Sequence, residues 1–143
     1  MATIRRNGSA RWQGAGKDGK GTLTTQSGTL RDTPYSFNTR FGDGQGTNPE
    51  ELIAAAHAGC FTMALAFKLQ GAGHTPESLE TEARLSMEQE AGGWTIAAIA
   101  LILRAKVPGI AAEEFQRLAA DAKATCPVSR VLKAEITLDA ALA

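Results

Sequence analysis

An almost unbroken apolar segment in the middle of the chain limits most strongly how the chain can fold. It follows Asn48, a preferred N-cap residue, and opens with Pro49, which suits the first helical position, with Glu51 as the third helical residue. Gly71 suits its end. These signals predict a helix over residues 49–70, with a length of roughly 33 Å at 1.5 Å per residue.

This predicted helix is apolar on nearly every side. Between residues 52 and 69 the clearly polar side chains are those of His57, Thr62 and Lys68. A helix of this kind must be covered on nearly every side, whereas one sheet covers a single face. Because its length approaches the diameter of a compact domain of this size, the sequence predicts a homodimer in which the helix packs against its two-fold mate.

Strands are expected on both sides of the helix. Residues 3–41 alternate loosely between apolar and polar side chains, with glycine-rich turns between them, which predicts three strands joined by hairpins. The later elements expected are strands 79–90 and 94–107 turned at Gly92 and Gly93, helices 111–124 and 127–133, and a last strand containing residues 136–142. This order predicts an α+β fold with mostly antiparallel sheets around the long helix.

Composition bounds the size of the fold and the kind of partner. The 143 residues are 43% apolar, which suits a single domain over residues 1–143 that needs neither disulfides nor a metal for stability. Fifteen basic residues balance fifteen acidic ones, so neither nucleic acid nor an acidic membrane is an expected partner. Residues 1–13 are polar and do not resemble a secretory signal, so we expect a cytoplasmic protein.

The two cysteines lie in unlike surroundings. Cys60 lies inside the apolar helix, and Cys126 directly precedes Pro127. In a reducing cytoplasm a pair of thiols reflects catalysis, redox cycling or chance more often than a structural disulfide. Cys60 is too far from the helix start to gain from the helix dipole, so it can react only if a distant cation approaches it. Arg40, on an expected strand end among aromatic residues, is the nearest upstream candidate.

An arginine held among apolar groups needs a carboxylate to orient it, and Glu50 and Glu51 at the helix start are both available. Glu50 lies roughly 15 Å from Cys60 along a straight helix, so the two cannot share a site within one subunit. An antiparallel partner helix would bring them together. At a helix start, Cys126 suits a second thiol that attacks an oxidised Cys60, as in a two-cysteine peroxidase cycle.

Other interpretations remain open from the residues alone. The cysteines could be structural in a non-catalytic dimeric protein that binds an apolar ligand. A zinc site formed by two histidines and two cysteines is a further alternative, although their spacing matches no compact metal motif: His57, Cys60, His74 and Cys126. The Asn48–Glu51 stretch could be no more than a helix cap, and Arg40 an ordinary surface side chain.

Three longer segments carry a resemblance to a known family. Residues 34–41, 46–61 and 126–132 closely resemble the OsmC/Ohr family of bacterial peroxide-resistance proteins, and the likeness extends over essentially the whole chain. The Asn-Thr-Arg-Phe and Cys-Pro-Val-Ser stretches look like the OsmC branch. The resemblance implies an intertwined α+β homodimer that reduces hydroperoxides, organic ones in preference to hydrogen peroxide, at the expense of thiols.

The resemblance also assigns roles. Cys60 matches the peroxidatic cysteine, Cys126 the resolving cysteine with which it forms an intrachain disulfide, and Glu50 the glutamate that orients the catalytic arginine. In the Ohr branch that arginine lies in the early hairpin, where this chain has Lys17, whereas Arg40 fits the OsmC branch. Arg40 is our choice because it offers a fixed charge and a bidentate fork. No metal or organic cofactor is implied, only an organic hydroperoxide and an external thiol or dithiol reductant.

Overall fold

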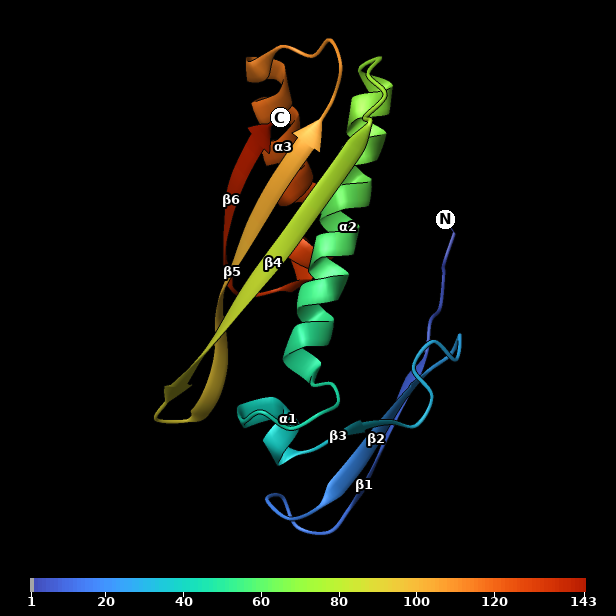
Figure 1. Cartoon of the computed structure of the whole chain (residues 1–143), viewed down its shortest axis with the longest axis vertical. Coiled ribbons are helices and arrows are strands. Elements are labelled where there is room, and N and C mark those ends of the chain that lie inside the picture. Colours follow the sequence, from blue (N-terminus) through green and yellow to red (C-terminus); the bar gives the residue numbers. More distant parts are fainter. Residues whose placement is uncertain (1) are drawn as a thin grey trace. The chain divides into compact units, whose positions relative to one another are not determined.

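A computed structural model describes residues 2–143 and confirms an α+β fold (Figure 1). The elements in chain order are β1 (Gly8–Gln13), β2 (Lys20–Thr25), β3 (Thr33–Tyr35), α1 (Phe37–Phe41), α2 (Pro49–Gly71), β4 (Ser78–Glu90), β5 (Gly93–Lys106), α3 (Ala112–Thr125), α4 (Pro127–Val131) and β6 (Glu135–Leu142). The chain divides into two compact units between Leu52 and Ile53, within the first turns of α2. The single domain expected over residues 1–143 stays a prediction.

The N-terminal unit is a three-stranded antiparallel sheet in the order β1-β2-β3, followed by α1. The rings of Trp12 and Tyr35 meet edge to face, with 5.4 Å between their centroids. They close over Gly21, where a Cβ atom would overlap both rings. The three strands expected before the long helix are therefore confirmed, although they are shorter than the segment that predicted them.

The expectation that Arg40 lies on a strand end was wrong, because residues 37–41 form the short helix α1. Ser36 caps this helix: its Oγ accepts a hydrogen bond from Thr39 N at 3.2 Å, and Ser36 N donates to Thr39 Oγ1 at 2.8 Å. This reciprocal capping box satisfies backbone groups that a strand would pair with a neighbour. The local cap thus outweighs the strand-like alternation of Tyr35 and Phe37.

The predicted start and end of the long helix are confirmed within one residue. Asn48 Oδ1 accepts a hydrogen bond from Glu51 N at 2.8 Å, and Pro49 is the first helical residue. Asn48 also donates from Nδ2 to the Thr39 carbonyl oxygen at 3.0 Å, which ties the helix start to α1. One side chain therefore both caps α2 and fixes the preceding segment.

We expect Asn48→Ala to lower the free energy of unfolding by about 1–2 kcal/mol, since it removes an N-cap acceptor and a second hydrogen bond. Urea denaturation followed by circular dichroism measures the change. Asn48→Asp is the matched control: it keeps the capping oxygen but not the Nδ2 donor, and it should lose less. An alanine variant as stable as the parent chain would show that this cap does not stabilise α2.

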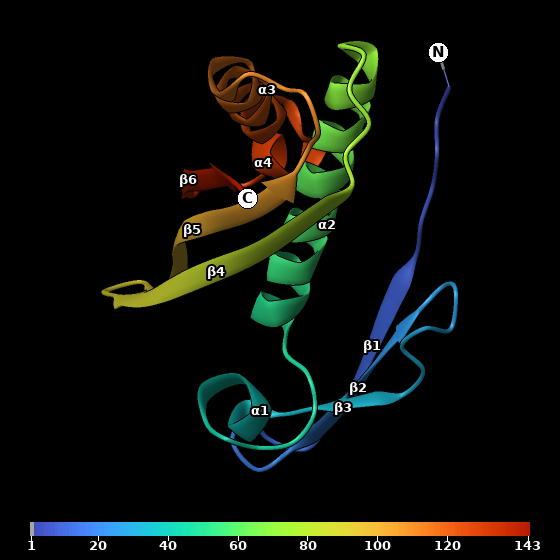
Figure 2. The same ribbon diagram turned by 45° about the horizontal axis from the view of Figure 1, so that its top comes forward.

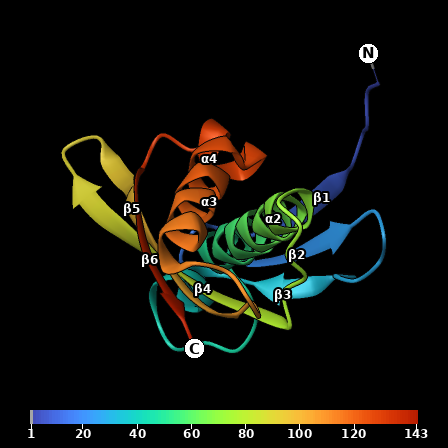
Figure 3. The ribbon, with the colours of Figure 1, turned by 90° about the horizontal axis from the view of Figure 1, so that it is seen from above.

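The C-terminal unit contains a second three-stranded sheet in the order β4-β5-β6. Strands β4 and β5 form the expected antiparallel hairpin, with a bulge between Ser86 and Met87, whereas β6 runs parallel to β5. The parallel pairing follows from the connection, because α3 and α4 carry the chain back along the sheet before β6 begins. Figures 2 and 3 show α2 and α3 over the same face of this sheet.

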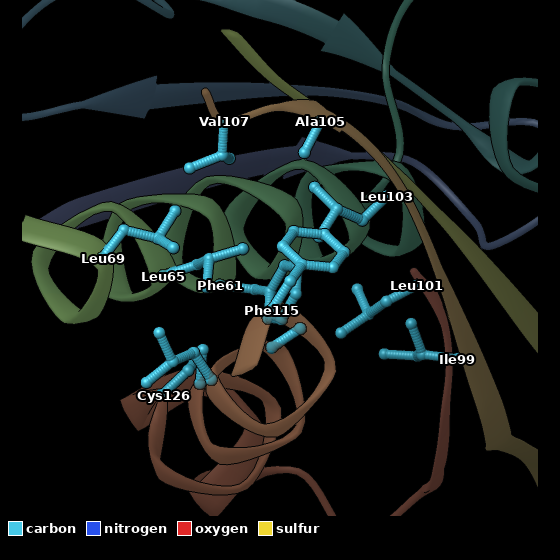
Figure 4. Close-up of a cluster of buried hydrophobic side chains, with 13 residues drawn as sticks. Phe61, Leu65, Leu69, Ile99, Leu101, Leu103, Ala105, Val107, Phe115 and Cys126 are labelled. Atoms are coloured by element: carbon cyan, nitrogen blue, oxygen red, sulfur yellow. The ribbon is translucent and has the colours of Figure 1, made fainter. Parts of the chain in front are cut away.

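The core lies between that face and the two helices (Figure 4). Helix α2 contributes a stripe of buried residues with a spacing of four, which are His57, Phe61, Leu65 and Leu69. The other contributors come from β5, α3 and the start of α4: Ile99, Leu101, Leu103, Ala105, Phe115, Leu118, Ala119, Ala122 and Cys126. Apolar burial on this scale accounts for the position of α2 against the sheet.

The opposite face of α2 is not covered in the same way. Met63 and Phe67 are 64% and 67% exposed. The helix is also long and apolar enough to cross a membrane by length and composition, a test that core helices of globular proteins pass as well. The expected two-fold mate against this face stays a prediction.

Candidate functional site

Cys60 and Cys126 come from separate helices and lie side by side in the C-terminal unit. Cys60, half-buried on α2, packs against the core cluster that contains the fully buried Cys126, and each thiol shifts the pKa of the other. Both thiols are free. The fold thus brings together the two cysteines that the sequence singled out.

The position of Cys126 follows from the helix junction around it. Its N–H donates to the Ala122 carbonyl oxygen at 3.0 Å and ends α3, and Pro127 begins α4 directly afterwards. Burial acts to raise the pKa of the Cys126 thiol, but the Cys60 thiol, the N–H and hydroxyl of Ser129 and the N–H of Val128 outweigh it and lower that pKa. The expectation that this helix start favours a thiolate agrees with that direction.

Cys60 is shifted in the opposite direction. Burial raises the pKa of its thiol, and so does the neighbouring Cys126 side chain, while the N–H of Val128 opposes these effects. Within one chain, the first negative charge of the pair therefore resides on Cys126. Cys60 requires a cation from elsewhere to carry that charge near neutral pH.

An ion pair of the predicted kind is present in the N-terminal unit. Arg40, on α1, donates from Nε to Glu50 Oε1 at 2.6 Å, and Glu50 is buried in the first turn of α2. The alternative carboxylate, Glu51, instead accepts a hydrogen bond from Thr47 Oγ1 at 2.8 Å. Glu50 is therefore the acid that orients the guanidinium.

Arg40 borders a cavity of about 380 Å³ in the same unit. Its lining is mainly aromatic: Trp12, Gly16, Lys17, Tyr35, Ser36, Phe37, Arg40 and Phe41. Lys17, the other candidate cation, lines this cavity too, with its Nζ 6.0 Å from the centroid of the Phe37 ring. Both cations thus face one apolar cavity, and the salt bridge to Glu50 belongs to Arg40.

The two histidines of the zinc alternative have other partners. His57 Nε2 lies 2.7 Å from Ser129 Oγ, and His74 Nε2 lies 2.7 Å from Glu114 Oε1. Within residues 2–143, no group of three or more histidine, cysteine, aspartate or glutamate side chains is arranged to hold a metal ion. The four residues considered therefore do not form a ligand set in this part of the chain.

Sequence reasoning connected His57 with the thiols only as a zinc ligand, and it gave Ser129 no role. Ser129 follows Cys126 by one helical turn, and His57 is a polar residue on the buried stripe of α2. A polar side chain in an apolar helix was the available signal, but it does not name its partner. Only the packing of α4 against α2 reveals the contact.

Comparison with known proteins identifies the family. Residues 42–141 match the family model described as OsmC-like protein. The chain belongs to the OsmC-like protein family. The resemblance noted in the sequence is thereby confirmed.

Relatives of this OsmC-like chain cover most of its length. It is 55% identical over 137 residues to peroxiredoxin OsmC of Escherichia coli K12, with 96% of each chain covered. It is 35% identical over 112 residues to the organic hydroperoxide resistance protein of Xanthomonas axonopodis pv. citri, with 78% and 75% covered. The crystal structure of an organic hydroperoxide resistance protein from Elizabethkingia anophelis superposes with a TM-score of 0.74 at 26% identity, covering all of both chains.

Proposed function

We propose that this OsmC-like protein is a thiol-dependent peroxidase that reduces organic hydroperoxides, and hydrogen peroxide more weakly, to alcohols or water. The observation that carries the proposal is the packing of Cys60 and Cys126 in one core cluster, close enough for each thiol to shift the pKa of the other. The names of the two relatives, peroxiredoxin and organic hydroperoxide resistance protein, support the same chemistry.

In the first step the Cys60 thiolate attacks the terminal oxygen of the hydroperoxide. The O–O bond breaks, the S–O bond forms, and the alkoxide takes up a proton and leaves as the alcohol. Cys60 becomes a sulfenic acid, oxidised by two electrons, while the peroxide is reduced by two. The step needs charge stabilisation and no metal or organic cofactor.

In the second step Cys126 attacks the sulfur of the Cys60 sulfenic acid. The Cys126 thiolate forms the S–S bond, the S–O bond breaks, and the departing hydroxide takes up the proton that Cys126 released on ionising and leaves as water. Two equivalents of an external thiol, or one dithiol, then reduce the disulfide and are themselves oxidised to a disulfide. The two thiols lie in one packed cluster, so the sulfur that attacks and the sulfur that is attacked start near each other.

The cation for Cys60 is, in this proposal, Arg40 of the partner subunit. Glu50 and Cys60 lie on different turns of one helix, so an antiparallel two-fold pair of α2 helices places the ion pair of one subunit beside Cys60 of the partner subunit. The exposed apolar face around Met63 and Phe67 supplies a surface for such a pair. A cytoplasmic homodimer with neither nucleic acid nor membrane as a partner stays our expectation.

Substrate preference follows from the cavity beside Arg40. Its aromatic walls, Trp12, Tyr35, Phe37 and Phe41, suit an alkyl or aryl group and offer few hydrogen bonds to a small polar peroxide. Phe61, the neighbour of Cys60 on α2, is fully buried in the core and therefore does not line this cavity. The guanidinium at the edge of this cavity would face the peroxide oxygens.

The test is consumption of cumene hydroperoxide by the purified protein with dithiothreitol, compared with hydrogen peroxide. We expect turnover of both, with kcat/KM at least about tenfold higher for cumene hydroperoxide, because one extra buried methylene or ring edge is worth 1 kcal/mol or more. After one equivalent of peroxide without reductant, peptide mass spectrometry should find Cys60 linked to Cys126. Unmodified thiols and no peroxide consumption would contradict the proposal and favour a non-catalytic protein that binds an apolar ligand.

A further inference from the structure

A buried histidine lies next to the thiol pair and has no role in the reaction described so far. His57 is fully buried on the same stripe of α2 as Phe61 and Leu65. Burial lowers the pKa of His57, so the ring is neutral near pH 7 and only one of its two nitrogens carries a hydrogen. Which nitrogen carries it decides what the ring can donate.

The contacts of the two nitrogens differ. Nε2 lies 2.7 Å from Ser129 Oγ, whereas the buried Nδ1 has no hydrogen-bond partner among residues 2–143. A buried N–H without an acceptor is rarer and more costly than a buried acceptor without a donor. The hydrogen therefore belongs on Nε2, which donates to Ser129 Oγ.

The direction of that bond determines what Ser129 does. Its oxygen accepts from His57, so its own hydroxyl hydrogen is free to donate elsewhere. Ser129 is the third residue of α4 and follows its N-cap, Cys126, by three residues, a spacing at which side chains on a helix are neighbours. The Ser129 hydroxyl contributes to the lowered pKa of Cys126, as expected for a donor to the thiolate.

We propose that His57 is a positioning residue for the second thiol: its Nε2–H holds Ser129 Oγ so that the Ser129 hydroxyl donates to Cys126 Sγ. This inference rests on the proposed peroxidase function and concerns its second step. A directional chain from His57 through Ser129 keeps Cys126 ionised after Cys60 has been oxidised. The ionised sulfur is the form that attacks the sulfenic acid.

The proposal predicts different effects on the rates of the two chemical steps. Removing the Ser129 hydroxyl takes a hydrogen bond from Cys126 but none from Cys60, so disulfide formation should slow much more than sulfenic acid formation. A purely structural role would depress both steps together. A role of His57 as a general base would require the ring to accept a proton, which a glutamine cannot do.

The experiment compares Ser129→Ala and Ser129→Thr with His57→Leu and His57→Gln. Glutamine keeps an N–H donor near the position of Nε2 but does not titrate. Each reduced protein is mixed with one equivalent of cumene hydroperoxide and quenched at intervals. Dimedone traps the sulfenic acid, mass spectrometry counts the disulfide, and absorbance at about 240 nm follows the thiolate of the resting enzyme against pH.

We expect Ser129→Ala and His57→Leu to slow disulfide formation about tenfold, corresponding to a rise of about one unit in the first apparent pKa of the thiol pair. Ser129→Thr and His57→Gln should retain most of the rate. Unchanged disulfide formation in Ser129→Ala would overturn the proposal, and so would a glutamine variant as slow as the leucine variant. If the parent protein forms no sulfenic acid at all, the peroxidase function fails instead, which distinguishes the two.

Discussion

Replacing Cys60 with serine is expected to abolish peroxide consumption, with a loss of at least about 10³-fold in kcat/KM, because a serine hydroxyl is not ionised near neutral pH and is a poor nucleophile toward oxygen. Cys126→Ser should behave differently. It keeps the attacking sulfur, so one equivalent of peroxide should still be consumed and the sulfenic acid of Cys60 should accumulate. Peroxide assays and dimedone labelling measure both outcomes.

The contrast between the two variants is the informative part. Two structural thiols would give variants with altered stability and equal, low peroxide consumption. Exchange of the roles, with sulfenic acid found on Cys126 in Cys60→Ser, would also contradict the assignment. That exchange is a real alternative to exclude, because within one chain Cys126 is the thiol with the lowered pKa.

The second large effect is expected at the ion pair. Arg40→Met should lower kcat/KM at pH 7 about 10²-fold, because it removes the cation that counteracts the raised pKa of Cys60. With that pKa still higher, less Cys60 is ionised at neutral pH, and the loss should shrink as pH rises toward the pKa. Glu50→Gln, which leaves the guanidinium without its 2.6 Å partner, should lose about tenfold. Values of kcat/KM measured from pH 5 to 10 test both losses and their dependence on pH.

A surface pair supplies the control. Arg84 donates to Glu82 at 2.8 Å with both side chains exposed, so Arg84→Met should leave the pH profile as it is. If Arg40→Met retains parental activity at every pH, Arg40 is not the cation, and Lys17→Met, in the same cavity, becomes the variant to measure.

The same substitution tests whether the site spans two subunits. Co-refolded Arg40→Met and Cys60→Ser chains would form mixed dimers in which one site combines an intact Arg40 with Cys60 of the partner subunit. At random pairing about a quarter of the parental activity should return, since half the dimers are mixed and each has one intact site of two. No recovery would place the arginine and the thiol in one subunit or reject the dimer.

The sequence predicted the elements with strong local signals. Asn48 and Gly71 bound the long helix within one residue, and Gly92 and Gly93 mark the β4–β5 turn. Helix α1 was missed because spaced aromatic residues resemble a strand, while the deciding capping box depends on Ser36 and Thr39. The parallel pairing of β6 could not be predicted either. Alternation of apolar and polar residues shows which face of a strand is buried but not which strand lies beside it.

For the candidate site, too, local features could be predicted from the sequence and long-range contacts could not. The candidate residues were chosen because each lies in a distinctive local setting, and their roles stay predictions. An arginine–carboxylate pair was expected, but only the structure shows that Arg40 bonds Glu50 and not Glu51.

The sequence suggested that Cys60 and Cys126 lie close together only through the family resemblance and the proposed reaction. Their separation along the chain does not reveal their distance in the folded protein. The hydrogen bond of His57 to Ser129 joins α2 to α4, and such long-range side-chain contacts arise only when the core packs.

The helices that precede β6 give the proposed disulfide an effect on the stability of the fold. Because Cys126 lies at the junction of α3 and α4, a bond to Cys60 would enclose β4, β5 and α3 in a covalent loop. Loop-closure entropy then makes unfolding of the oxidised form harder by about 4 kcal/mol. The stability of this part of the chain would thus rise when the disulfide forms and fall when it is reduced in each turnover. The reductant must supply the free energy that breaks the disulfide.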